Sequence, residues 1–290
     1  VLGTTACGKS GLGVELAKRF DGEIVSADSR QVYKGLDLGT GKVTEEEMEG
    51  VPHHMLDVVE PNQPYSVADF QAGAYAAIDD ILARGRTPFL VGGTGLYVRA
   101  VTEGFTFTDA RPDPALRAEL EGKTTEELYA LLREKTGVTL TGGEENNRHR
   151  LMRSVEKALS GRWESPPPCP RYDCLLLGVT FPREEVCRRI DVRLQARIDA
   201  GMLDEVADLR ANGATDAFLE GLGLEYRYIL RYLTGQIPTL DGLKDELGRA
   251  IKRFAKRQMV WFKKDRDVLW LDMEGDFLTQ AVRAVEGFLA

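Results

Sequence analysis

Eight residues near the start of the chain have the types and spacing of a phosphate-binding loop. The run GTTACGKS, from Gly3 to Ser10, fits the pattern G-x-x-x-x-G-K-[ST]. Its glycines let successive backbone N–H groups turn toward phosphate oxygens at the positive end of the following helix. Lys9 adds a point charge, and the hydroxyl of Ser10 can coordinate Mg²⁺. The pattern therefore predicts a phosphate site with magnesium.

A carboxylate follows the second predicted strand. Asp28 lies three residues beyond Val25, at the carboxyl end of that strand, where α/β sheets place their functional groups. Near a phosphate loop, such a carboxylate can bind Mg²⁺ or accept a proton, and the spacing does not decide between the two. A helix cap or a turn is the simpler alternative for an Asp that precedes a Ser.

A glycine turn after the third predicted strand carries Thr94, within the run VGGTGLY. In an NTPase this position would normally hold an aspartate that secures Mg²⁺. No Asp or Glu lies between Phe89 and Ala100. The absence counts against ordinary ATP hydrolysis and indicates that the phosphates of the ligand are bound without being cleaved from one another.

Basic side chains gather in three places of a chain whose net charge is −8. A predicted helix carries four of them: Arg183, Arg189, Arg193 and Arg197. They form either a solvated stripe balanced by nearby acids or a clamp on a highly charged leaving group, since guanidinium groups suit phosphate oxygens. Two further basic segments, 147–162 and 244–266, make a polyanionic partner more credible than the net charge suggests.

Alternating strands and helices must position these residues. The predicted order is a helix over 11–20, a strand at 24–25, a helix over 66–85, a strand at 89–91, a strand within 172–181, helices over 183–213, 226–235 and 243–264, a strand at 267–272 and a C-terminal helix. This order is typical of an α/β fold: a P-loop NTPase-like parallel sheet flanked by helices. We expect a core of residues 1–110 and 167–290, interrupted by a helical insertion over 111–166.

Two predicted helices have clear apolar faces. The first places Phe70, Ala74, Ile78 and Leu82 on its buried side, after a cap at Ser66. The second buries Leu247, Ile251, Phe254 and Trp261, with most of its basic residues on the other side.

Longer strings resemble one family, the tRNA dimethylallyltransferases or tRNA isopentenyltransferases, in its bacterial form. The strings, which cover nearly the whole chain in order, are GTTACGKS, SADSRQVYKGLDLGTGK, PHHMLDVVEPNQPYSVADF, GRTPFLVGGTGLYVRAV, DPALR, RRIDVRLQARIDAGMLDEV and RFAKRQMVWFKKD. The resemblance implies a magnesium-dependent transfer of a dimethylallyl group from dimethylallyl diphosphate to tRNA. The acceptor would be the exocyclic amine of the adenosine 3′ of the anticodon. The phosphate loop would then hold the diphosphate of the prenyl donor, which explains the missing acid near Thr94.

The resemblance also implies roles for individual residues. Asp28 matches the general base, and Thr94 and Arg189 match further catalytic positions. The diphosphate would be bound by Gly3, Thr4, Thr5, Ala6, Cys7, Gly8, Lys9, Ser10, Arg183 and Arg189, with Mg²⁺ at Ser10. The anticodon stem-loop would contact Asp28, Ser29, Arg30, Gln31, Thr94, Arg117, His149, Arg150, Arg153 and Arg227.

This sequence departs from the family pattern in places. It has TTAC in the phosphate loop where PTAS is common, and GLGLEYRYIL replaces the usual Ile-Gly-Tyr-Lys/Arg run around Arg227.

Composition limits the remaining possibilities. Four scattered cysteines, no C-x-x-C pair and no apolar run near 20 residues predict a cytoplasmic protein without zinc, a disulfide framework or a membrane partner. We expect a monomer. A phosphate loop normally follows a full strand, so we also expect residues before Val1. Three alternatives remain open: a small-molecule or nucleotide P-loop kinase, an enzyme that prenylates free adenylate, and a non-catalytic tRNA-binding module.

Overall fold

The computed structural model describes residues 1–107, 113–140, 144–161 and 166–290. The chain forms two compact units, which are treated separately. The core unit comprises Val1–Thr102 and Arg171–Ala290, and the insertion unit comprises Glu103–Pro170. The phosphate loop and Asp28 belong to the core unit, whereas Arg117, His149, Arg150 and Arg153 belong to the insertion unit.

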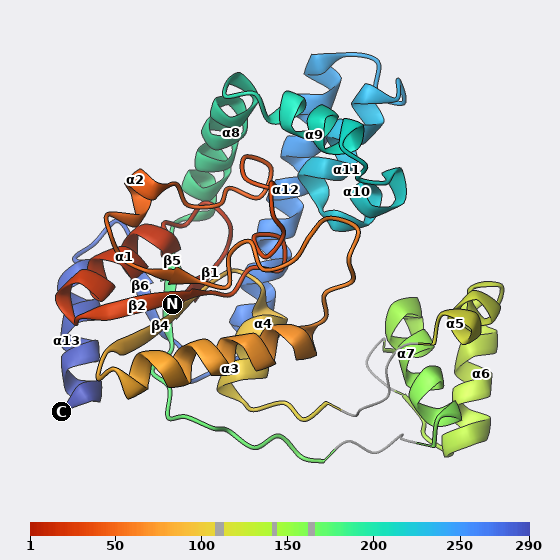
Figure 1. The fold of residues 1–290 in the computed structure, drawn as a ribbon, viewed down its shortest axis with the longest axis horizontal. Coiled ribbons are helices and arrows are strands. Elements are labelled where there is room, and N and C mark those ends of the chain that lie inside the picture. Colours follow the sequence, from red (N-terminus) through yellow and green to blue (C-terminus); the bar gives the residue numbers. More distant parts are fainter. Residues whose placement is uncertain (108–112, 141–143, 162–165) are drawn as a thin grey trace. The chain divides into compact units, whose positions relative to one another are not determined.

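Six parallel strands carry the core unit (Figure 1). In one sheet, β2 (Gly22–Ser26) lies between β3 (His53–His54) and β4 (Thr87–Val91). In the other, β5 (Leu177–Thr180) lies between β1 (Leu2–Gly3) and β6 (Leu269–Asp272). A parallel bridge from Leu2 to Gly92 joins β1 to the end of β4, so the phosphate loop leaves the middle of the combined array. The predicted parallel sheet is confirmed.

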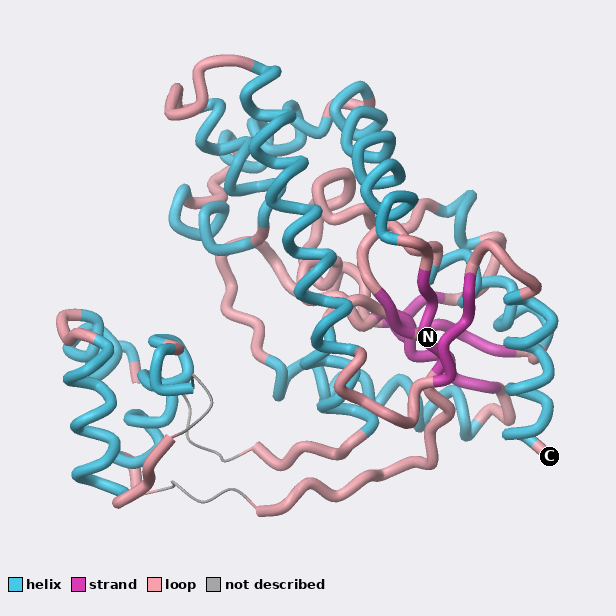
Figure 2. The backbone as a smooth tube through the Cα atoms, turned by 180° about the vertical axis from the view of Figure 1, so that it is seen from behind, coloured by secondary structure: helices cyan, strands magenta, loops and turns pink. Residues whose placement is uncertain are grey.

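Consecutive residues of β2 face two different helices. Ile24 packs in the hydrophobic cluster that includes Leu12 and Leu16 of α1 (Lys9–Arg19). Val25 belongs to another cluster, together with Phe70 of α3 (Val67–Ala83). Side chains alternate between the two faces of a strand, so α1 and α3 cover opposite faces. Figure 2 shows the strands in magenta with helices around them.

The predicted apolar face of α3 was wrong at one position. Phe70, Ala74 and Ile78 are buried, but Leu82 is 47% exposed and Ile81 takes its place. Ile81 is eleven positions after Phe70, which is about three turns at 3.6 residues per turn, whereas Leu82 is twelve positions after it and lies past the buried face. The predicted cap is confirmed, because the Ser66 hydroxyl accepts the Asp69 N–H and the Asp69 carboxylate accepts the Ser66 N–H.

The long predicted helix over 183–213 is two helices. α8 (Arg183–Asp199) and α9 (Met202–Ala211) are separated at Gly201, whose φ is 97°. This left-handed conformation favours glycine and turns the chain. α10 (Asp216–Leu222), which was not predicted, and α11 (Leu224–Leu233) follow.

The longest helix, α12 (Leu240–Phe262), packs against α8, α11, β1 and α4 (Gly95–Thr102). Leu247 and Ile251 are buried as predicted. Phe254 is not, because 39% of it is exposed. The buried face of α12 instead includes Ala250, Ala255 and Phe262, and Phe254 lines a cavity described below.

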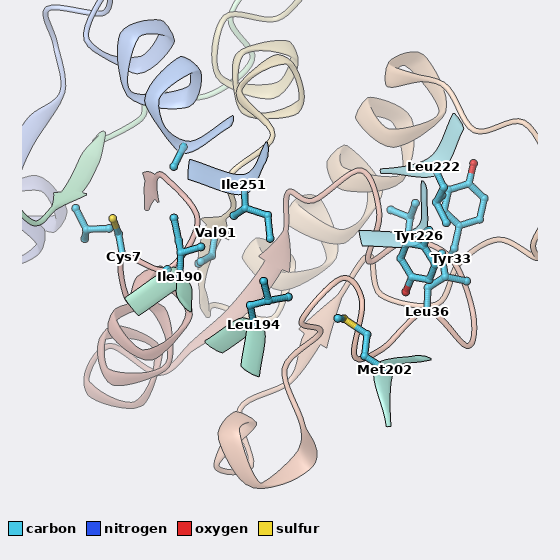
Figure 3. Close-up of a cluster of buried hydrophobic side chains, with 14 of the residues drawn as sticks. Cys7, Tyr33, Leu36, Val91, Ile190, Leu194, Met202, Leu222, Tyr226 and Ile251 are labelled. Carbon is cyan, nitrogen blue, oxygen red and sulfur yellow. The ribbon is translucent and has the colours of Figure 1, made fainter. Parts of the chain in front are cut away.

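One hydrophobic cluster links the phosphate loop to the helices beyond the sheet (Figure 3). It runs from Cys7 through Ile190 and Leu194 of α8 to Tyr226 of α11, and all four side chains are buried. The remaining elements of the core unit are α2 (Glu45–Met48) and α13 (Phe277–Leu289). Among the described residues, no helix is long and apolar enough to cross a bilayer.

The insertion unit is helical. It consists of α5 (Pro114–Glu121), α6 (Thr125–Thr136), the 3₁₀ turn η1 (Glu144–Asn146) and α7 (Arg148–Leu159). Its own core is formed by Leu120, Leu128, Leu132, Leu151, Met152 and Val155. The two ends of the unit run together, because the Cys169 N–H donates to the Gly104 carbonyl at 2.8 Å. The unit extends over 103–170, while the sequence predicted 111–166.

Candidate active site

A cavity of about 560 Å³ lies at the carboxyl ends of the central strands. Its wall includes most of the predicted site residues of the core unit: Thr5, Lys9, Ser10, Asp28, Ser29, Arg30, Gln31, Thr94 and Arg227. A second cavity of about 500 Å³ adjoins the phosphate loop and is lined by Ala6, Cys7, Gly8, Lys9, Ser10 and Arg189, among others. Lys9, Ser10 and Arg193 line both cavities, so phosphate groups bound at the loop would lie beside the larger one.

The phosphate loop has the backbone geometry that its glycines predict. Gly3, at the end of β1, has no space for a side chain, because a Cβ atom there would lie 2.7 Å from the Val179 carbonyl oxygen. Gly8 immediately precedes α1 with φ 79°. Thr4 is buried, and its hydroxyl lies 2.8 Å from the Cys7 sulfur. These contacts place the Thr4 and Cys7 side chains behind the loop, away from a ligand.

Lys9 is held across the loop. Its ammonium group donates to the Thr4 carbonyl at 2.7 Å. Burial lowers the pKa of Lys9 to about 8; the neighbouring Arg193 acts in the same direction, whereas Cys7 and Asp28 oppose it. An anion bound at the loop would favour the charged ammonium and raise this pKa again.

Asp28 is fixed by the turn that follows β2. Its Oδ1 accepts the Arg30 N–H at 2.8 Å. The neighbouring Ser29 N–H donates to the Thr94 hydroxyl oxygen at 3.0 Å, and the Thr94 N–H donates to the Ala27 carbonyl at 3.2 Å. Thr94 therefore holds the turn that presents the Asp28 carboxylate to the cavity.

The arginines of α8 spread along the loop. Arg189 donates through Nε to the Ala6 carbonyl at 2.8 Å, and its guanidinium lies 4.6 Å from the centre of the Phe181 ring. Arg193 donates to the Thr5 hydroxyl. Burial and, to a smaller extent, the adjacent Arg197 lower the pKa of Arg193 to about 10. Two positive groups, one helical turn apart, therefore contact the loop.

Two α8 residues differ from their assignment by family resemblance. Arg183, matched to a diphosphate-binding position, is exposed at the first residue of α8 and lines neither cavity. Arg197, to which the resemblance gave no role, lines the larger cavity and lies 3.9 Å from the Glu225 carboxylate. Arg193 and Arg197 are two of the four arginines that the sequence offered as a possible clamp on the leaving group, and both line the larger cavity.

α12 contributes a wall of the cavity that sequence reasoning missed. Phe254, Arg257, Gln258 and Trp261 all line it, at helical intervals of three or four residues. The pattern was visible, but Phe254 and Trp261 had been interpreted as part of the buried stripe, and no role was given to Gln258.

The predicted tRNA-contacting residues of the insertion unit form two groups. Arg117 and Arg153 donate to the carboxylate of Glu156 at 2.8 and 3.0 Å, and Glu156 is only 3% exposed. His149 and Arg150 are exposed on the first turn of α7. Arg227, in the core unit, donates to the Glu220 carbonyl at 2.8 Å while lining the larger cavity.

The oxygen groups at the loop fit Mg²⁺. Mg²⁺ usually keeps several waters and is held by one or two protein oxygens together with substrate phosphates. The Ser10 hydroxyl and the Asp28 carboxylate line the same cavity as Lys9. In the described part of the chain no group of three or more His, Cys, Asp or Glu residues is placed to bind a metal, and a magnesium ion carried on phosphates does not need one.

The chain matches two family models. One, described as IPP transferase, matches residues 31–265, and the other, described as isopentenyl transferase, matches residues 1–60. The tRNA dimethylallyltransferase of Oceanobacillus iheyensis is 38% identical over 306 aligned positions, covering 100% of this chain and 95% of the relative. The tRNA dimethylallyltransferase 2 of Shewanella sediminis is 42% identical over 288 positions, covering 97% of this chain and 95% of the relative.

Solved structures give the same result. The tRNA isopentenylpyrophosphate transferase of Bacillus halodurans is 37% identical with a TM-score of 0.74, and the match covers 99% of this chain and 93% of that one. A eukaryotic dimethylallyltransferase acting on tRNA is 25% identical with a TM-score of 0.81, covering 99% of this chain and 78% of that one. The resemblance inferred from the motifs is confirmed, and the chain belongs to the tRNA dimethylallyltransferase (IPP transferase) family.

Proposed function

We propose that this chain transfers a dimethylallyl group from dimethylallyl diphosphate to the exocyclic amine of the adenosine 3′ of the anticodon in tRNA, and releases diphosphate. The observation that carries the proposal is the joint placement of Lys9, Ser10 and Asp28 in one cavity. A leaving-group site and a base must share one enclosed space if an amine is to be alkylated there. Membership in the family supplies the substrate class.

The phosphate loop stabilises the leaving group. As the carbon–oxygen bond of the donor breaks, its electron pair passes to the diphosphate, and an allylic cation can develop on the carbon side. Lys9, Arg193 and the backbone N–H groups of the loop lie where this negative charge grows. Mg²⁺, held by the Ser10 hydroxyl and the phosphates, would supply further positive charge when bound. Arg189 fixes the loop by donating to the Ala6 carbonyl.

Asp28 acts on the acceptor. The amine of adenine is a weak nucleophile because its lone pair is delocalised into the ring. As its nitrogen bonds to the allylic carbon, the proton that it loses passes to the Asp28 carboxylate. The base must leave its stack to enter the cavity, which is easier in a single-stranded anticodon loop than in a duplex. Ser29, Arg30 and Gln31 directly follow Asp28 on the cavity wall and would contact the adenine there.

The tRNA would also contact basic residues outside the cavity. We propose that Arg227 and the exposed His149 and Arg150 contact the anticodon stem-loop. Arg117 and Arg153 would also contact the stem-loop while they remain paired with Glu156, whose carboxylate fixes their guanidinium groups. We further propose that the enzyme acts as a monomer in the cytoplasm, where its tRNA substrate is found.

The test is transfer of label. Purified protein is incubated with Mg²⁺, labelled dimethylallyl diphosphate and unmodified tRNA, beside Asp28→Asn and a matched control, Asp208→Asn, at an exposed position of α9. We expect label in tRNA from the wild type and from Asp208→Asn, and a loss of about 10²- to 10⁴-fold in kcat for Asp28→Asn.

Parallel reactions with free AMP as acceptor, and with labelled ATP in place of the prenyl donor, separate the alternatives. Label that passes to AMP but not to tRNA would replace the proposal with adenylate prenylation. Consumption of ATP without prenylation would replace it with a kinase, and retained tRNA binding without either reaction would indicate a binding module.

A further inference from the structure

The side chain of Gln258 connects two backbone segments that belong to different parts of the cavity. The Thr5 N–H donates to Gln258 Oε1 at 3.0 Å, and Gln258 Nε2 donates to the Gly93 carbonyl at 2.8 Å. Thr5 is in the phosphate loop, Gly93 is in the turn after β4, and Gln258 comes from the C-terminal part of α12. One half-buried amide thus spans the loop and the turn.

The fit between α12 and this turn is close. A Cβ atom on Gly93 would lie 3.1 Å from Gln258 Nε2. One on Gly95 would lie 2.3 Å from the Trp261 ring, and the centre of that ring lies 5.4 Å from the Arg99 guanidinium. Gln258 and Trp261 are three residues apart and therefore on the same face of α12. α12 therefore packs closely against the turn after β4 at two neighbouring positions, Gln258 on Gly93 and Trp261 on Gly95.

Each backbone segment that Gln258 holds leads to one reacting partner. On one side, Thr5 belongs to the loop that carries Lys9, and its hydroxyl accepts a hydrogen bond from Arg193 of α8. On the other, Gly93 directly precedes Thr94, which holds the turn of Asp28 through the Ser29 N–H. The amide therefore lies between the site of the leaving group and the site of the base.

We propose that Gln258 is a positioning residue that sets the separation between the phosphate loop and Asp28. The inference rests on the proposed function. An amide suits the role because it offers one acceptor and one donor at fixed separation, and both are used here. An ionised carboxylate of the same length keeps the acceptor but places a second negative oxygen against the Gly93 carbonyl. A protonated carboxyl group restores the donor.

This difference between the two forms of a carboxyl group gives a direct test. Gln258→Glu, Gln258→Met and Gly93→Ala are compared with the wild type and with a control, Gln280→Glu, at an exposed position of α13. Transfer of label to tRNA is measured from pH 5.5 to pH 8.5, and binding of isopentyl diphosphate is measured in parallel. Isopentyl diphosphate is the saturated analogue of the donor and cannot form an allylic cation.

We expect kcat to fall about 10- to 100-fold in Gln258→Glu at pH 8.5, since small displacements of reacting groups cost this much. The loss relative to the wild type should shrink several-fold toward pH 5.5, as the introduced carboxyl group takes up a proton. Gln258→Met should show a loss that does not depend on pH. The dissociation constant of isopentyl diphosphate should change much less than kcat in Gln258→Glu and in Gln258→Met. Gln280→Glu should match the wild type in both measurements.

Several results would overturn the inference. Wild-type kcat in Gln258→Glu and Gln258→Met, or a loss explained entirely by weaker binding of isopentyl diphosphate, would refute it. So would a Gln258→Glu defect of constant size across the pH range. If both Gln258 variants fail to fold, Gly93→Ala decides, because its methyl group presses on the Gln258 amide without removing it; full activity there would refute the inference. A wild type that transfers no label to tRNA would refute the proposed function and the inference with it.

Discussion

The pKa of Lys9 makes binding of the prenyl donor depend on pH in a direction that can be worked out. In the free protein, burial brings this pKa to about 8, from an ordinary value of 10.5. The ammonium group is therefore about 90% charged at pH 7 and about 10% charged at pH 9. A bound diphosphate favours the charged form and returns the pKa toward its ordinary value. Binding should thus be accompanied by uptake of a proton whenever the pH lies between the two pKa values.

The expected size follows from these values. The dissociation constant should rise by about five- to tenfold between pH 7 and pH 9, and about 0.7 proton should be taken up at pH 8.5. We would titrate isopentyl diphosphate calorimetrically in two buffers that differ in ionisation enthalpy. The last proton of the diphosphate leaves near pH 6, at about the pKa of a phosphomonoester. The charge of the ligand is therefore nearly constant between pH 7 and pH 9.

Two variants serve as controls for the titration. Ser10→Ala should weaken binding by a similar factor at every pH, because it leaves the Lys9 ammonium in place. Asp28→Asn removes a negative group that raises the pKa of Lys9, so the midpoint should move to lower pH. A dissociation constant that stays flat from pH 7 to pH 9, or a release of protons on binding, would refute the reasoning.

Three further predictions concern stability. Glu23→Gln should lower the free energy of unfolding by about 3 kcal/mol near neutral pH, because it breaks the ion pairs of the buried Glu23 carboxylate with Arg84 and Arg86. The arginines hold the pKa of Glu23 at about 2, so the advantage of the wild type in melting temperature should decline as the pH falls from about 4.5 toward 2. A difference in melting temperature that stays constant over this range would contradict the prediction. Gly41→Ala should lower both stability and turnover, because φ is 62° and a Cβ atom would lie 1.5 Å from Arg197; Gly50→Ala, with φ 77° and no atom within 4 Å, measures the backbone strain alone and should retain turnover. Glu156→Gln should destabilise the insertion unit by about 2–4 kcal/mol, since two arginines lose their buried partner; hydrogen exchange should show the effect within α5 and α7 and little change in α1, and equal loss in both units would contradict it.

Strongly periodic and capped segments were predictable from the sequence. α3 has a complete capping box, and Phe70, Ala74 and Ile78 repeat at four-residue intervals, so its existence and its orientation could be predicted within one residue. β3 is only two residues long, His53–His54, and leaves no periodic signal. The break at Gly201 was missed because residues on both sides favour helix, although a glycine followed by a new amphipathic segment is itself a stop signal.

The candidate site was predictable to the extent that it follows local motifs. Lys9 and Asp28 each follow a strand, and parallel strands bring their carboxyl ends to one edge, so their meeting in one cavity could be expected. The role of Gln258 could not. It is 253 residues from Thr5, and both groups that it contacts belong to the backbone and leave no side-chain pattern.

The order of the strands has a consequence for how the protein folds during synthesis. Leu2 of β1 pairs with Gly178 of β5, while β2, β3 and β4 find their partners within residues 22–91. Pairing across so long a stretch of chain is slow, because loop closure must come first. During synthesis, the sheet of β2, β3 and β4 and then the insertion unit with its own core can therefore form before β5 is available to pair with β1. The phosphate loop would be among the last parts of the core unit to reach its final geometry, so a nascent chain arrested before β5 is exposed should contain folded helices but bind no diphosphate.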